Sequence, residues 1–151
     1  RDRSKMPVWV EDCKVGGCYK FNESNSEYLV TQGSEAQPDE VSVEAWVWRD
    51  SSDTGNSVIL QKHQGTYLNF RLAIENGVLK WQRRYDYVTY ASPSSDVWHH
   101  VVGTFNGTHL KLYIDGVLVN TSLAPSVFLA VPAGSADGFR PDRTLSSWAI
   151  R

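Results

Sequence analysis

Three short turn sequences constrain this chain most, because each is flanked on both sides by strand-like residues. They are Asn76-Gly77, Asn106-Gly107 and Asp115-Gly116. Asn-Gly and Asp-Gly readily adopt the positive φ angles of type I′ turns, which join two antiparallel strands through a two-residue loop. The turns therefore predict hairpins that join residues 67–75 to 78–85, 98–105 to 108–114, and 111–114 to 117–121.

The segments beside these turns alternate apolar and polar side chains with a period of two. Phe70, Leu72 and Ile74 form one apolar series, and Leu110, Leu112 and Ile114 form another. A period of two places successive side chains on opposite faces of a strand. Further strands are predicted over residues 19–21, 28–31, 41–48 and 57–62, and no stretch of ten residues has a convincing helical period. Strands this short and numerous predict an all-β, two-layer antiparallel sandwich.

The predicted strand over residues 41–48 has two different faces. Its odd-numbered residues are the small apolar ones, Val41, Val43, Ala45 and Val47, which suit the space between two sheets. Its even-numbered residues are Ser42, Glu44, Trp46 and Trp48. The second set predicts a sheet face that is partly open to solvent and lined with aromatic rings.

Length and charge exclude several classes of protein. The chain has 151 residues, a usual size for one domain, so residues 1–151 are expected to form a single domain. The formal net charge of −2 supplies no basic field for a phosphate backbone, so nucleic acid is not an expected partner. Apolar runs fall far short of the roughly 20 residues of a membrane helix, and Arg1–Lys5 has no apolar signal-peptide core.

The two cysteines, Cys13 and Cys18, enclose a Gly-Gly turn. No second cysteine pair or histidine ladder accompanies them, so they do not form a zinc site. They can form a disulfide across the turn in an oxidising compartment. We favour two reduced, buried thiols, because unpaired cysteine commonly packs as a small hydrophobic residue.

Five phrases follow one another along the chain, namely Val15–Asn22, Tyr28–Val30, Val41–Val47, Trp98–Phe105 and Leu110–Gly116. Their order and spacing over about residues 14–121 resemble the laminin-G-like family of concanavalin A-like lectin/glucanase jelly rolls. The resemblance implies a jelly-roll sandwich of two curved sheets, used as a module in exported proteins, so an extracellular or cell-surface location is expected. Such domains typically bind carbohydrates or other proteins, some hold calcium, and a minority of the superfamily are glycoside hydrolases.

The C-terminal segment departs from that family after about Ala124. Family members finish with a closing strand that carries a Gly-x-Ile-Asp-Glu-like phrase, and Pro125–Arg151 has no such phrase. An unpaired sheet edge is therefore expected near the N-terminal strand, and such an edge invites pairing with another chain. We predict a homo-oligomer on this ground, with a truncated or frameshifted fragment as the other explanation of the atypical tail.

A glycoside hydrolase on this fold requires two carboxylates roughly 5 Å apart, which one strand supplies from acids at positions i and i+2 or i+4. The superfamily's hydrolases carry a Glu-x-Asp-x-Glu phrase or a close variant, and this chain has none; Glu44 stands alone on its strand. His99 and His100 are adjacent, so on a strand they point to opposite faces and do not chelate one ion together. We therefore expect no catalytic residues and a chain that is not an enzyme.

One loop suits a calcium ion. Oxygen donors, the ligands that calcium prefers, recur at Asn22, Ser24, Asn25 and Glu27. The same residues are ordinary turn formers, and few of them are carboxylates. We expect no metal or other cofactor, with calcium at this loop as the alternative.

The aromatic and basic stretch Lys80–Tyr90 is the best candidate for a binding site. Sugar rings stack their apolar C–H faces on Trp and Tyr, and their hydroxyl groups require planar polar groups. If Trp81 points inward, only the tyrosines of this stretch remain exposed; in the opposite register, Arg83 and Tyr85 line the groove. The predicted carbohydrate-binding residues are Trp48, Trp81, Tyr85, Tyr87 and Tyr90 for stacking, and Arg71, Arg83 and Arg84 for hydrogen bonds.

The sequence thus favours a non-catalytic module that binds carbohydrate through an aromatic-lined sheet face. The alternative is a protein-interaction or assembly domain that uses an open edge and the C-terminal tail. The expected partner is a carbohydrate or a protein, and neither nucleic acid nor a membrane.

Overall fold

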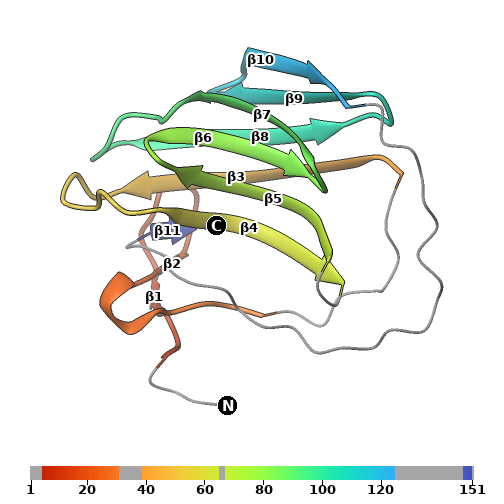
Figure 1. Ribbon diagram of the computed structural model, residues 1–151. Coiled ribbons are helices and arrows are strands. Elements are labelled where there is room, and N and C mark those ends of the chain that lie inside the picture. The colour runs from red at the N-terminus through yellow and green to blue at the C-terminus, as the bar shows by residue number, and fades with distance from the viewer. Residues whose placement is uncertain (1–4, 31–38, 65–66, 125–147, 151) are drawn as a thin grey trace.

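Alternating strands dictate a two-layer fold, and the computed structural model shows two antiparallel sheets packed face to face (Figure 1). It describes residues 5–30, 39–64, 67–124 and 148–150. The seven-stranded sheet contains, in spatial order, β1 (Val8–Val10), β2 (Cys18–Lys20), β11 (Trp148–Ile150), β3 (Val41–Arg49), β8 (Trp98–Phe105), β9 (His109–Ile114) and β10 (Val117–Leu123). The four-stranded sheet contains β4 (Ser57–Gln64), β5 (Tyr67–Glu75), β6 (Val78–Arg83) and β7 (Asp86–Ala91). The predicted all-β jelly-roll sandwich is confirmed.

Two predicted hairpin turns have the expected left-handed backbone. Asn76 and Gly77 have φ angles of 51° and 76° between β5 and β6, and Asp115 and Gly116 have φ angles of 51° and 81° between β9 and β10. At Asn106 the side chain organises the turn, because its Oδ1 atom accepts hydrogen bonds from the backbone N–H groups of Thr108 and His109.

The predicted strand over residues 78–85 is too long. β6 ends at Arg83, and Arg84, with a φ of 51°, turns the chain into β7. This turn lacks glycine and asparagine, so its sequence carried no turn signal. Residues 28–30, predicted as part of a strand, lie outside the strands, and the short strand β1 was not predicted.

The core lies between the two sheets and follows the predicted alternation. Ala45, Val47, Val101, Leu110 and Leu112 face it from the seven-stranded sheet; Leu72, Ile74, Leu79, Trp81 and Val88 face it from the four-stranded sheet. Trp81 is the largest fully buried side chain, and its indole N–H donates to the carbonyl oxygen of Thr104 at 2.9 Å. The partly open outer face predicted for residues 41–48 is confirmed, because Ser42 and Glu44 are exposed and Trp46 and Trp48 are half-buried, whereas Ala45 and Val47 are buried.

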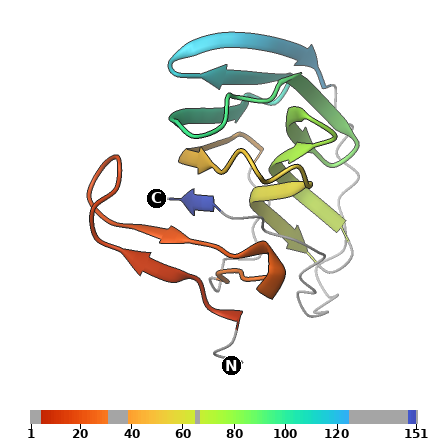
Figure 2. The ribbon, with the colours of Figure 1, turned by 90° about the vertical axis from the view of Figure 1, so that its left-hand side faces the viewer.

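Strand β11 corrects the expectation of an unpaired edge beside the N-terminal strand. It lies between β2 and β3 and pairs with both (Figure 2), with Ile150 opposite Tyr19 on one side and Val47 on the other. We expected this position to be empty, because the sequence lacks the family's closing-strand phrase. Three residues of the tail occupy it instead. The edges of this sheet are β1 and β10.

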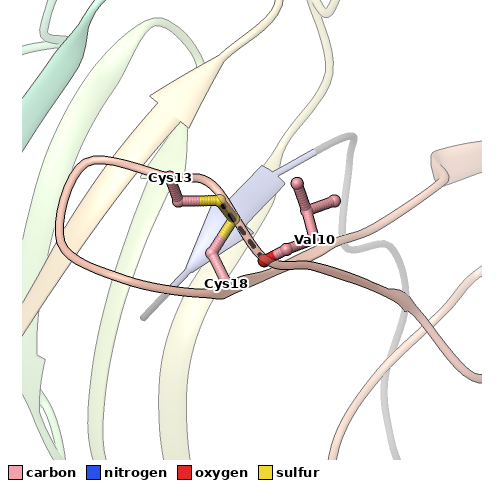
Figure 3. Close-up of a disulfide and its surroundings, with 3 residues drawn as sticks. All are labelled: Val10, Cys13 and Cys18. Atoms are coloured by element: carbon pink, nitrogen blue, oxygen red, sulfur yellow. Dashed lines mark hydrogen bonds between the residues drawn. A yellow bond between two sulfur atoms is a disulfide. The ribbon is translucent and has the colours of Figure 1, made fainter.

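The expectation of reduced thiols is also corrected. Cys13 and Cys18 form a disulfide that closes the β1–β2 hairpin, with their Cα atoms 6.0 Å apart (Figure 3). The turn between them is held by a hydrogen bond from the Cys13 N–H to the carbonyl oxygen of Gly16. Sequence spacing alone did not distinguish a bridged pair from two buried thiols, because both are compatible with a Gly-Gly turn.

Candidate functional site

The eight predicted carbohydrate-binding residues do not form one site. They fall on different parts of the sandwich: Trp48 on the outer face of the seven-stranded sheet, Arg71 and Tyr87 on the outer face of the four-stranded sheet, Arg84 and Tyr85 at the β6–β7 turn, Tyr90 on the edge strand β7, and Trp81 and Arg83 between the sheets. Only the predicted residues that lie on or beside the outer face of the four-stranded sheet are near one another.

Trp81 and Arg83 leave the predicted set, because the register places both inside. Trp81 has no exposed surface, and Arg83 is 4% exposed with its guanidinium carbon 4.3 Å from the centroid of the Phe105 ring. Burial, with a smaller effect of neighbouring Arg84, lowers the pKa of the Arg83 guanidinium. Of the two registers left open by the sequence, the structure has the one in which Trp81 points inward.

A row of four side chains crosses the outer face of the four-stranded sheet, one from each strand. Strand register places Gln61 beside Arg71, Arg71 beside Gln82, and Gln82 beside Tyr87. We call these four residues the polar row. The row consists of amide and guanidinium groups and ends at Tyr87, which is 54% exposed. Such planar polar groups beside an aromatic ring are the combination that a sugar requires.

Ion pairs hold the polar row in place. Arg71 Nη2 lies 2.8 Å from Glu75 Oε1, and Lys80 Nζ lies 3.3 Å from Glu75 Oε2. The same Lys80 nitrogen lies 4.7 Å from the centroid of the Tyr87 ring, and Gln82 Nε2 donates to the carbonyl oxygen of Arg84 at 2.7 Å. Arg71, Gln82 and Tyr87 are therefore organised before any ligand arrives, which lowers the entropic cost of binding.

Asn69 adds unmet hydrogen-bonding groups to this face. It lies two residues before Arg71 on β5, so their side chains emerge on the same side of the sheet. Asn69 is only 6% exposed, and among the residues that the structure describes neither its Nδ2 nor its Oδ1 atom has a hydrogen-bond partner; Arg71 Nε has none there either. Leaving such groups buried and unpaired costs about 1–3 kcal/mol each.

A second aromatic surface covers the outer face of the seven-stranded sheet. Trp46 pairs with His100 across β3 and β8, with ring centroids 5.1 Å apart, and Trp48 lies opposite Trp98. The Lys14 ammonium of the disulfide loop lies 5.5 Å from the Trp46 ring centroid. These rings are half-buried, and the sequence predicted only Trp48 among them as a ligand-stacking residue. Trp46, Trp98 and His100 could be recognised as part of this surface only from the register between β3 and β8.

The histidine pair is arranged as predicted, on opposite faces of β8. His100 lies beside Trp46, and its Nε2 atom lies 3.4 Å from Glu44 Oε2. His99 instead contacts the β9–β10 turn, where its Nδ1 atom lies 2.7 Å from Asp115 Oδ2. Each ring therefore has its own acidic partner.

Asp115 makes a pH-dependent contribution to stability. Desolvation raises the pKa of its carboxyl, but hydrogen bonds from His99 and from the His100 N–H outweigh that effect, so the pKa lies below its usual 3.8. A depressed folded-state pKa gives stabilisation that is present above the unfolded pKa and is lost as pH falls through the folded pKa. The unfolding free-energy difference between wild type and Asp115→Asn should therefore shrink as pH falls from about 5 to about 2. Urea unfolding at each pH measures this free-energy difference. A difference that stayed constant over that range would contradict a stabilising role of the Asp115 carboxylate.

The loop that we considered for calcium uses its carboxylate internally. Glu27 is buried, and its two oxygens accept hydrogen bonds from the Asn22 N–H at 2.8 Å and from Asn25 Nδ2 at 3.1 Å. Within the described part of the chain, no group of three or more His, Cys, Asp or Glu residues is placed to hold a metal ion. A calcium site here stays a prediction. No helix among the described residues is long and apolar enough to cross a membrane.

Comparisons with known proteins agree with this architecture. The family model described as the concanavalin A-like lectin/glucanases superfamily matches residues 23–138. No curated protein matches the sequence.

Several solved structures share the fold. The botulinum neurotoxin serotype D binding domain is 17% identical with a TM-score of 0.51, over 89% of this chain and 31% of that one. A Trypanosoma rangeli sialidase mutant displaying trans-sialidase activity is 16% identical with a TM-score of 0.52, over 94% and 26%. A botulinum neurotoxin type C structure, whose cell entry is described as dependent upon interaction with two ganglioside molecules, is 14% identical with a TM-score of 0.52, over 94% and 38%. The chain thus spans well under half of each neighbour, and at these identities the likeness concerns the fold alone.

Proposed function

Because the chain belongs to the concanavalin A-like lectin/glucanases superfamily, we propose that it is a carbohydrate-binding module whose ligand lies on the outer face of the four-stranded sheet. The observation that carries the proposal is the polar row, which brings a half-exposed tyrosine and planar polar groups together on one face. The proposal retains Arg71 and Tyr87 of the residues predicted from sequence, and adds Gln61 and Gln82.

The proposed ligand stacks one sugar ring on Tyr87 and extends across the strands toward Arg71. Adjacent strands are about 4.8 Å apart, so Tyr87 and Arg71 lie roughly 10 Å apart at their backbones, enough for a short oligosaccharide. Ring hydroxyl groups would accept hydrogen bonds from Gln82 and Arg71. Stacking supplies part of the affinity, and the planar polar groups supply orientation.

The neighbouring structures support sugar as the ligand class. One is described by its interaction with gangliosides, which carry sugars, and another is a sialidase. Those descriptions belong to those proteins, and the support they give is an analogy of fold. The disulfide adds support for an extracellular or cell-surface location, because such bonds persist in oxidising compartments.

A glycan array followed by titration of the best ligand tests the proposal. Tyr87→Ala should raise the Kd at least about tenfold, a loss of about 1.4 kcal/mol, while the Tm stays unchanged because the ring is half-exposed. Gln82→Ala should weaken binding by a similar factor.

Tyr85→Ala is the matched control, since Tyr85 is 85% exposed and lies at the β6–β7 turn, off the polar row. We expect it to bind as the wild type does. Wild-type affinity in Tyr87→Ala, or a loss confined to Tyr85→Ala, would remove the site from this face.

The second candidate function is assembly with another chain through β10. This strand is an edge of the seven-stranded sheet and exposes Val117, Leu118 and Leu123. Apolar edge strands are templates for pairing with a second chain. Light scattering tests this: we expect a dimer that Leu118→Lys converts to a monomer, and a wild-type mass equal to one chain would eliminate the idea.

A further inference from the structure

A serine, a histidine and an aspartate form a hydrogen-bonded chain at one end of the sandwich. Ser94 Oγ lies 2.8 Å from His99 Nε2, and His99 Nδ1 lies 2.7 Å from Asp115 Oδ2. Ser94 lies in the β7–β8 connection, His99 near the start of β8, and Asp115 in the β9–β10 turn. The β7–β8 connection lies at the same end as the β3–β4 connection in Figure 1.

The carboxylate of Asp115, the last residue in this hydrogen-bonded series, is held through both of its oxygens. Asp115 Oδ1 accepts from the backbone N–H of His100 at 2.8 Å, and the Asp115 N–H donates to the carbonyl oxygen of His100 at 2.8 Å. Its Oδ2 atom remains for His99. A carboxylate at Nδ1 holds the imidazole in the tautomer with hydrogen on Nδ1, which leaves the Nε2 lone pair to accept the Ser94 hydroxyl hydrogen.

The loop that carries Ser94 is also fixed. Asp96 donates its N–H to the carbonyl oxygen of Arg49 at 2.7 Å, and its side chain accepts from the Ser51 N–H at 3.0 Å. Ser94 itself is exposed, whereas the His99 side chain is only 16% exposed. The hydroxyl is therefore accessible to a reagent from solvent, while its base is largely shielded by the fold.

We propose that Ser94 is an activated nucleophile that accepts acyl groups from carboxylic esters, with His99 as its general base and Asp115 as a positioning residue. A serine hydroxyl is a weak nucleophile until an adjacent base removes its proton, and a third group commonly orients that base. This activity goes beyond carbohydrate binding and uses a different end and face of the molecule.

The proposed reaction balances without any cofactor. Ser94 Oγ attacks the ester carbonyl carbon while its proton passes to His99 Nε2; the bond from that carbon to the leaving oxygen then breaks, and Nε2 returns the proton to the departing alcohol. Water, deprotonated by the same nitrogen, attacks the acyl carbon, releases the carboxylic acid and restores the Ser94 hydroxyl.

A fluorophosphonate probe tests the nucleophile directly on the full chain. Ser94 Oγ displaces fluoride from phosphorus, so intact mass rises by one adduct and peptide mapping should locate it on Ser94. Ser94→Ala should abolish the adduct. Ser95→Ala, which changes the neighbouring hydroxyl only, should be labelled like the wild type.

The base and its positioning residue have separate readouts. His99→Gln should slow labelling at least about a hundredfold. Asp115→Asn, which suits the turn because Asn tolerates positive φ, should slow it and change the pH profile of the labelling rate. If His99→Gln does not fold, as judged by circular dichroism, the pH profile of the wild-type labelling rate serves as the test instead. A labelling rate that does not change as the base becomes protonated at low pH would refute the proposal.

Two further results would overturn the proposal: an adduct that persists in Ser94→Ala, or a wild-type labelling rate no greater than that of His99→Gln. Neither result bears on the proposal of a carbohydrate site. Ser94→Ala should keep wild-type glycan affinity and Tyr87→Ala should keep wild-type labelling, so a failure of one proposal is distinguishable from a failure of the other.

Discussion

Gly103→Ala should lower the free energy of unfolding by about 2–3 kcal/mol, because its added methyl group enters the Trp81 ring. A Cβ atom on Gly103 would lie 2.7 Å from Trp81 Cε3 and 2.8 Å from Trp81 Cγ. The ring is fully buried and its N–H is bonded to Thr104, so it cannot withdraw without breaking that bond or opening the core. Urea unfolding followed by tryptophan fluorescence measures the loss.

Gly17→Ala is the matched control, since it makes a similar collision at the surface. A Cβ atom on Gly17 would lie 2.7 Å from Trp9 Cε2. Trp9, however, is 52% exposed, so its ring can turn toward solvent and relieve the contact. We expect a cost below about 1 kcal/mol there, as is usual for surface substitutions. Equal losses at the two glycines would show that the buried Trp81 ring is not the cause.

A double-mutant cycle isolates the contact between Gly103 and Trp81. Trp81→Phe alone is destabilising, because it removes ring volume and the hydrogen bond to Thr104. The smaller ring leaves room for the new methyl group, so the double variant should be more stable than the sum of the two single losses predicts. Strict additivity within about 0.5 kcal/mol would contradict a direct steric coupling.

Local signals predicted most of the strands and turns correctly. The Asn76-Gly77 and Asp115-Gly116 turns and the alternation at Leu110 and Leu112 are local, because neighbouring residues alone determine turn backbone and strand face. The turn at Arg84 was missed, since a residue with no turn preference adopts the left-handed backbone there. The position of β11 was missed because a three-residue strand finds its place through pairing with β2 and β3, far away in sequence.

The candidate site was less predictable than the fold, because it depends on register between strands. A shift of one residue exchanges the faces of β6, so the sequence alone did not decide whether Trp81 or Gln82 faces solvent. The polar row became visible only when Arg71, Gln82 and Tyr87 were aligned across three strands. Likewise, Asp115 is 16 residues from His99 in the chain, and the β8–β9 register brings it there, whereas Ser94 reaches His99 from the adjoining β7–β8 connection.

Reduction of the Cys13–Cys18 disulfide should destabilise the protein by about 2 kcal/mol, the entropy that a short closed loop removes from the unfolded chain. For a chain of this length, that loss lowers the Tm by roughly 4–8 °C. The bond constrains β2, and β2 in turn pairs with β1 and β11, so its loosening weakens two strand pairings. Thermal unfolding with and without a reducing agent measures the effect, with free thiols counted to confirm reduction.

The double variant Cys13→Ala/Cys18→Ala separates this effect from other actions of the reducing agent. Alanine suits the buried position of Cys18, which is 1% exposed, whereas serine would bury a hydroxyl group without a partner. The variant should melt at the temperature of the reduced wild type and should not respond to the reducing agent. A wild-type Tm that stays constant after complete reduction would show that the β1–β2 hairpin is held by its strand pairing, the Lys14–Trp46 contact and the packing of Trp9 on Tyr19 alone.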